Sequence, residues 1–266
     1  MAHRTLLVLP CLVANAPPAL VAIGARHARW LACTALLCSA AAGAAAASGC
    51  NANAGERQTP VIELYTSEGC SSCPPADQWL STLKGQPLVA QAFHVAYWDY
   101  IGWKDRFANP DHTSRQRALA RANRQPGIYT PQVLRNGRDW RQWRHASAAD
   151  LATSPARATI RITRGVDTDR FEALVVPRQA AASWTAYWTV TEHGHQSRVT
   201  AGENAGELLK QDFVVRQYVP VGQYTGAQIL RFHAVPPVAG HPRQINLVVS
   251  DPLTAQPLQA VSLACG

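Results

Sequence analysis

Residues 60–85 read PVIELYTSEGCSSCPPADQWLSTLKG, and this stretch decides the fold that the sequence predicts. The apolar run at 61–65 is typical of a buried strand. After the second cysteine, apolar residues recur with the spacing of one helical face: Ala76, Trp79, Leu80 and Leu83. The two prolines before them suit a first helical turn, where N–H groups have no helical partner, and Gly85 can end the helix. We therefore expect a strand, a loop that carries Cys70 and Cys73, and a helix.

The position of the two cysteines favours thiol chemistry. A helix N-terminus stabilises a thiolate and lowers a thiol pKa from about 8.5 toward roughly 3.5 to 7 in Cys-x-x-Cys sites. We expect Cys70 to be the more exposed thiol, which attacks a partner's disulfide. Cys73 would then resolve the mixed disulfide. This chemistry requires no cofactor and no metal.

The order strand, Cys70-Ser71-Ser72-Cys73, helix resembles the thioredoxin superfamily, and ELYT at 63–66 is locally similar to glutaredoxins. Three longer motifs resemble a bacterial family of exported thioredoxin-like proteins of unknown function: YTSEGCSSCPPAD at 65–77, FHVAYWDYIGWKD at 93–105 and YTPQVLRNG at 129–137. The resemblance runs from about residue 60 to the C-terminus. It implies a thioredoxin-like fold with a redox site, and it supplies no substrate.

Thr130-Pro131 resembles the cis-proline loop of thioredoxins, because it precedes a strand that ends in Asn136-Gly137, a strong hairpin signal. We predict a cis Thr130–Pro131 bond that faces the cysteine pair. Pro131 has no N–H, so the backbone of Thr130 would stay free to pair with an extended substrate.

The segment YWDYIGW at 97–103 is too aromatic for an ordinary exposed loop. One interpretation is an internal packing cluster. The other is a rim in which Tyr97, Trp98 and Trp103 grip a partner's peptide beside the cysteines, since aromatic anchors dominate interfaces.

The rest of the chain predicts two domains after an N-terminal leader. Residues 87–96 read as a buried strand parallel to the first, and 111–124 as a helix with its arginines outward. From Ala158 the hydrophobic period changes to two, which is typical of short strands. The predicted fold is an α/β thioredoxin-like domain over 60–156 followed by a β-rich, β-sandwich-like domain over 157–266. Within the latter, Gly202–Gly206 reads as a turn that packs against the first domain or, alternatively, contacts substrate.

Residues 1–59 read as an export signal and linker. A basic region at 26–29 precedes an apolar run at 30–47 that ends in three alanines, so we expect an exported protein, periplasmic or anchored to the envelope. Retention of the run as a membrane anchor is the alternative. Cys50 suits a lipoprotein signal and is a candidate for lipidation. If it stays free, it can form a disulfide with Cys265 in an oxidising compartment.

The net charge of +8 is concentrated at 101–150, where ten Lys and Arg residues accompany four Asp residues. No helix-turn-helix, zinc-finger or RNA-binding signature accompanies this charge, so we expect no nucleic-acid partner. A solvated basic face explains it, as does a surface for an acidic partner or anionic envelope lipid.

Three functions are compatible with these patterns. The first is thiol–disulfide exchange on exported proteins, through Cys70 and Cys73. The second is an envelope binding protein in which this pair forms a structural disulfide. The third is a copper-handling module, because thiolates suit Cu(I) and His94 or His112 could complete a site.

Overall fold

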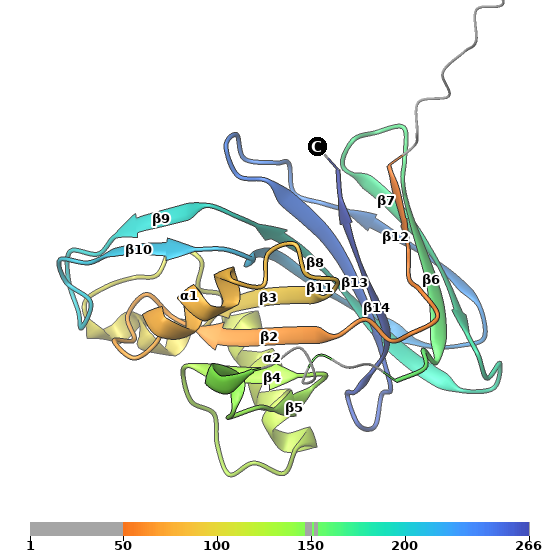
Figure 1. The fold of residues 1–266 in the computed structure, drawn as a ribbon, viewed down its shortest axis with the longest axis horizontal. Coiled ribbons are helices and arrows are strands. Elements are labelled where there is room, and N and C mark those ends of the chain that lie inside the picture. The colour runs from red at the N-terminus through yellow and green to blue at the C-terminus, as the bar shows by residue number, and fades with distance from the viewer. Residues whose placement is uncertain (1–49, 147–150, 152–153, 266) are drawn as a thin grey trace, which may run out of the picture. The chain divides into compact units, whose positions relative to one another are not determined.

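The computed structural model describes residues 50–146, 151 and 154–265, which lie within one compact unit. Its largest sheet contains β2 (Val61–Thr66), β3 (Val89–His94), β4 (Gln132–Arg135), β5 (Arg138–Asp139), β8 (Ser183–Glu192), β11 (Val214–Thr225), β13 (Arg243–Ser250) and β14 (Pro257–Ala264). These eight strands lie in the order β14-β13-β8-β11-β3-β2-β4-β5 (Figure 1).

Two smaller sheets complete the β structure. A four-stranded sheet has the order β1 (Asn51–Asn53), β6 (Ala158–Arg164), β7 (Arg170–Pro177), β12 (Gln228–His233). A two-stranded arm pairs β9 (His195–Arg198) with β10 (Leu208–Gln211). The helices are α1 (Pro74–Ser81) and α2 (Pro110–Ala122), with short 3₁₀ helices η1 (Ala96–Ile101) and η2 (Trp143–His145).

The strand, cysteine loop and helix predicted from residues 60–85 are present as β2 and α1. Cys73 is the N-cap of α1, and the two prolines occupy its first turn. β2 and β3 pair in parallel, with Leu64 opposite Ala92, as expected. The β4–β5 hairpin turns at Asn136 and Gly137, which both have positive φ, as the hairpin signal predicts.

The predicted fold class is wrong. β3 is not an edge strand of its sheet, because it pairs in parallel with β11, with Ala92 opposite Val214. β11 in turn pairs with β8, β8 with β13, and β13 with β14. Strands assigned to a separate β-sandwich-like domain therefore belong to the same eight-stranded sheet as the cysteine-bearing segment. The protein is mostly β-sheet and not an α/β thioredoxin-like domain. Periodicity identified many of these strands but carries no information on which sheet edge each one joins.

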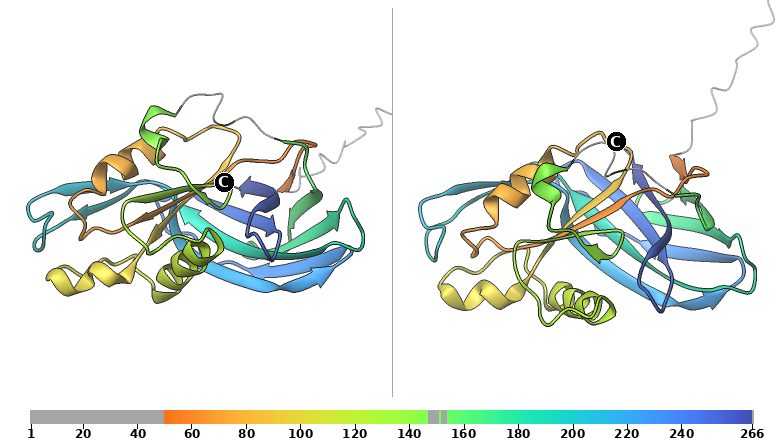
Figure 2. Two further views of the ribbon diagram at one scale, coloured as in Figure 1. Left: turned by 90° about the horizontal axis from the view of Figure 1, so that it is seen from below. Right: turned by 60° about the horizontal axis from the view of Figure 1, so that its bottom comes forward.

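Side chains alternate along β2 and separate two cores. Ile62 and Leu64 pack with α1, whereas Val61 and Tyr65 pack with Leu119 of α2. α1 and α2 therefore cover opposite faces of this part of the sheet (Figures 1 and 2). A third core fills the space between the four-stranded sheet and β8, β13 and β14. β1 comes from the part of the chain that the sequence assigns to the linker, and it pairs with β6. The proposed signal at 1–49 lies outside the described residues.

Candidate functional site

Cys70 and Cys73 form a disulfide at the junction of β2 and α1. Their Cα atoms lie 5.4 Å apart. The Cys73 N–H donates to the carbonyl oxygen of Cys70 at 3.1 Å, which closes the loop into a tight turn before the helix. The turn places the first sulfur before the helix and the second at its N-cap, as the sequence predicts.

Both cysteines are buried, so Cys70, which was expected to be the more exposed thiol, hardly differs from Cys73 in its exposure. Cys70 is 1% exposed and Cys73 is 0% exposed, while Ser71 and Ser72 between them face solvent. A Cβ added at the adjacent Gly69 would lie 3.2 to 3.3 Å from Ile101 and Trp98, which shows how closely η1 covers the loop.

The turn at 202–206 covers the loop from another side. Asn204 is 5% exposed, and its Nδ2 donates to the carbonyl oxygens of Glu68 at 2.8 Å and Cys70 at 3.1 Å. The Glu203 carboxylate accepts a hydrogen bond from the Ser71 N–H at 3.0 Å. The interpretation of this segment as a packing turn is confirmed. Its partner, the cysteine loop, was not identified from the sequence, because only the Gly-rich composition of the turn is visible there.

The Thr130–Pro131 bond is cis, as predicted. The last ladder pair of β2 and β4 joins Tyr65 to Gln132, so Pro131 lies next to the end of β2 that leads to the cysteines. Trp98 Nε1 donates to Thr130 Oγ1 at 2.7 Å. Trp98 thus connects the proline loop with Gly69 of the cysteine loop, and these two predicted site regions come together.

The aromatic segment contacts the rest of the protein at the start of η1 and just after its end. Trp103 Nε1 donates to Glu68 Oε2 at 2.8 Å, and Tyr97 packs against the core on the α2 side. Tyr100, by contrast, is 83% exposed. These contacts support the packing interpretation for Trp98 and Trp103, and their role in substrate binding stays a prediction.

A buried polar cluster lies behind the cysteine loop, and the sequence did not reveal it. Asp105 Oδ2 lies 2.6 Å from His94 Nδ1 and accepts from the Glu68 N–H at 2.9 Å. Burial lowers the pKa of His94, but the charge and hydrogen bond of Asp105 outweigh it and raise that pKa. Burial raises the pKa of Asp105, while His94 and two backbone N–H groups more than reverse this and lower it.

Asp77 links this cluster to the cysteines. It lies one helical turn after Cys73, so the two side chains share a face of α1. Burial raises its pKa to about 7, against the opposing charge of His94 and the hydrogen bond from Thr66 Oγ1. Asp77 can therefore hold or accept a proton near neutral pH. No local motif marks such a residue, because its pKa depends on residues of β2, of β3 and of two loops.

The histidines considered for copper are engaged elsewhere: His94 with Asp105, and His112 Nδ1 with the carbonyl oxygen of His94 at 2.9 Å. Among the described residues, no group of three or more His, Cys, Asp or Glu is placed to hold a metal ion. Burial lowers the pKa of His112 to about 4. These positions favour structural roles for both histidines.

A second disulfide joins Cys50 to Cys265, with Cα atoms 6.0 Å apart. Of the two alternatives for Cys50, the structure contains the disulfide. Acylation uses the same sulfur atom, so the two states exclude each other. Within the described part of the chain, no helix has the length and apolar character needed to cross a membrane.

Fold and site together define a largely β protein that carries a buried Cys-x-x-Cys disulfide. The chain belongs to the family described as "Protein of unknown function (DUF1223)", whose model matches residues 61–250. This match agrees with the resemblance to a family of unknown function. It gives no support for an assignment to the thioredoxin superfamily. No curated protein matches the chain.

Two solved structures have a similar fold. Protein AGR_C_4864 from Agrobacterium tumefaciens is 24% identical, with a TM-score of 0.58 over 79% of this chain and 96% of that one. HBP35 of Porphyromonas gingivalis is 13% identical, with a TM-score of 0.51 over 79% of this chain and 76% of that one. At these identities the likeness concerns the fold alone.

Proposed function

We propose that the protein exchanges disulfides with exported proteins through Cys70 and Cys73. The observation that carries the proposal is their disulfide just before α1, with Asp77, whose pKa burial raises to about 7, one helical turn after Cys73. The helix N-terminus stabilises a thiolate at this place.

The exchange step conserves electrons and protons. A partner's thiolate attacks the Cys70 sulfur, the Cys70–Cys73 bond breaks, and Cys73 leaves as a thiolate that takes the proton of Asp77. A second thiolate of the partner then attacks the mixed disulfide and releases the Cys70 thiolate. The partner is oxidised by two electrons and the cysteine pair is reduced. The reverse sequence reduces a partner's disulfide, and Asp77 then accepts the proton of Cys73.

Trapping of mixed disulfides tests this proposal. In a Cys73→Ser variant the resolving thiol is missing, so complexes between Cys70 and partner proteins should accumulate in cells and dissolve on reduction. The Cys70→Ser variant is the matched control and should accumulate far fewer. If the two variants capture equally little, exchange on proteins is ruled out.

A structural disulfide is the second candidate function, and the burial of both sulfurs favours it. In that case the protein would bind an envelope partner without chemistry at the cysteines. The reduction potential of the pair separates the two functions. Structural disulfides lie below about −300 mV, whereas a pair that exchanges in an oxidising compartment has a higher potential.

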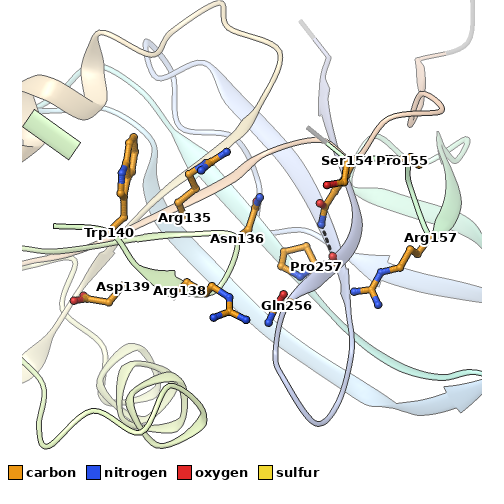
Figure 3. A pocket seen from close by; sticks show the side chains of 11 residues that line it. Arg135, Asn136, Arg138, Asp139, Trp140, Ser154, Pro155, Arg157, Gln256 and Pro257 are labelled. Carbon is orange, nitrogen blue, oxygen red and sulfur yellow. Dashed lines mark hydrogen bonds between the residues drawn. The ribbon is translucent and has the colours of Figure 1, made fainter. Parts of the chain in front are cut away.

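Location and partner chemistry follow from the same proposal. Two disulfides persist in an oxidising compartment, which supports an exported protein. For an acidic partner or anionic envelope lipid, one candidate surface surrounds a cavity of about 540 Å³ bordered by Arg135, Arg138 and Arg157, with Asp139 as its acidic residue (Figure 3). This cavity lies at the β4–β5 hairpin and is separate from the cysteine loop.

A further inference from the structure

We propose that residues 199–207 form a cover that must lift from the cysteine loop before Cys70 can react. This inference rests on the proposed exchange function and names the element that regulates it. It starts from a conflict in the structure: a thiolate must reach a sulfur in line with the disulfide, yet Cys70 is 1% exposed. Some element that covers the loop has to move.

The cover is fastened to the cysteine loop through two adjacent side chains. Asn204 bonds to the carbonyl oxygens on either side of Gly69, and Glu203 bonds to the N–H of Ser71. Three backbone groups of the loop, within residues 68–71, are thereby held from a segment more than a hundred residues later in the sequence. The hydrogen bond from Ser71 also lowers the pKa of Glu203, so this fastening stays ionised at neutral pH.

The segment is built to move as a unit. Its backbone is closed by hydrogen bonds of its own, from the Gly206 N–H to the Val199 carbonyl oxygen at 2.9 Å and from the Val199 N–H to that of Glu207 at 3.0 Å. Gly202 and Gly206 have positive φ, which glycine adopts without strain. The base of the arm is anchored separately, through Gln211 Nε2 to Glu68 Oε1 at 3.0 Å.

Space for the movement lies beside the helix. A cavity of about 560 Å³ separates the first turn of α1 from the arm, with Ser71, Pro74 and Asp77 on one wall and Glu203, Glu207 and Lys210 on the other. The β9–β10 arm therefore does not pack continuously against α1.

The alternative cover, η1, is held more firmly. Its Trp98 bonds to Thr130 and packs against the core on the α2 side, and Trp103, just after η1, bonds to the buried Glu68. In the cover, by contrast, Val199 and Asn204 are the buried residues, and Glu203, Ala205 and Gly206 face solvent. Lifting the turn gives up the hydrogen bonds of Glu203 and Asn204 to the cysteine loop. It also frees the Ser71 N–H, which can then donate to a backbone carbonyl oxygen of the partner.

The test measures how fast dithiothreitol reduces the Cys70–Cys73 disulfide in the folded protein. Samples are quenched with acid, alkylated and mapped by peptide mass, which separates this pair from Cys50–Cys265. Glu203→Ala should raise the rate at least about threefold and Asn204→Ala about tenfold, since each removes hydrogen bonds that hold the cover closed. The matched control is Glu207→Ala, an exposed carboxylate of the same segment, and its rate should equal that of the wild type.

Unchanged rates in both variants would overturn the cover. The solvent-exposed Glu203 keeps this outcome decisive even if replacement of the buried Asn204 disturbs folding. The outcomes also separate failure of the cover from failure of the proposed function. If Glu203→Ala accelerates reduction, but Cys73→Ser traps no partner either alone or combined with Glu203→Ala, then the cover exists and exchange does not. If Cys73→Ser traps partners while the rates are unchanged, exchange stands and the cover is wrong.

Discussion

Arg115 shows how one side chain holds α2 onto the large sheet. The sequence predicts outward arginines on this helix, but Arg115 points inward and is 12% exposed. Its guanidinium donates to both carboxylate oxygens of Glu63 on β2, at 2.9 and 2.7 Å, and lies 3.9 Å from the ring centre of Tyr187 on β8. The pattern missed it because the partner, Glu63, stands in a strand that otherwise reads as apolar.

Replacing Arg115 by Ala should lower the free energy of unfolding by about 3 to 5 kcal/mol, because it leaves the buried Glu63 without its counter-charge. Urea titration measures the change. Arg231→Ala is the control: its pair with Glu172 is exposed at 75% and 54%, so the loss should be at most about 1 kcal/mol. Equal losses in the two variants would contradict the role assigned to Arg115.

Asp77 should make stability depend on pH. Because its pKa is about 7 in the folded protein and near 4 when unfolded, the folded state alone keeps the proton between these values. Unfolding free energy should therefore decline as pH rises from 4 to 7 and level off above that. Asp77→Asn removes this component, so the wild type should lose stability relative to the variant across the window. Urea midpoints at several pH values measure it, with the exposed Asp167→Asn as control. Parallel profiles for wild type and Asp77→Asn would exclude the raised pKa.

At the level of elements, local signals predicted what local contacts build. The i, i+3, i+4 apolar spacing gave α1, the Asn-Gly pair gave the β4–β5 hairpin, and both cysteines fell at the start of the helix. The pairing of β3 with β11 was not predictable in this way, because both strands are apolar on both faces at their contact and fit several sheets.

The same distinction between local and long-range contacts applies to the candidate site. Cys70, Cys73 and the neighbourhood of Thr130 and Pro131 could be named from motifs. Their burial could not, since it depends on a turn at 202–206 that is close to the cysteines only in the folded chain. Sequence reasoning identifies reactive residue types more readily than it identifies what covers them.

At the scale of the described unit, the Cys50–Cys265 disulfide closes residues 50–265 into one loop with a sequence separation of 215. Replacing both cysteines by Ser should lower unfolding free energy by about 2 to 5 kcal/mol, because the unfolded chain gains the freedom of a very long loop. Urea titration of the oxidised proteins measures this. The Cys70→Ser, Cys73→Ser double variant opens a loop with a separation of only three residues and should lose less. A larger loss in that control would contradict the loop-length argument.

The parallel pairing of Ala92 with Val214 joins a strand that is made early in synthesis to one that is made late. As the chain is synthesised, N-terminus first, β2 and β3 are made early, and the free edge of β3 keeps unpaired backbone groups until β11 follows. A piece cut after residue 156 would keep that edge permanently and should self-associate. Chaperones that shield open strand edges would thus be needed most during this interval.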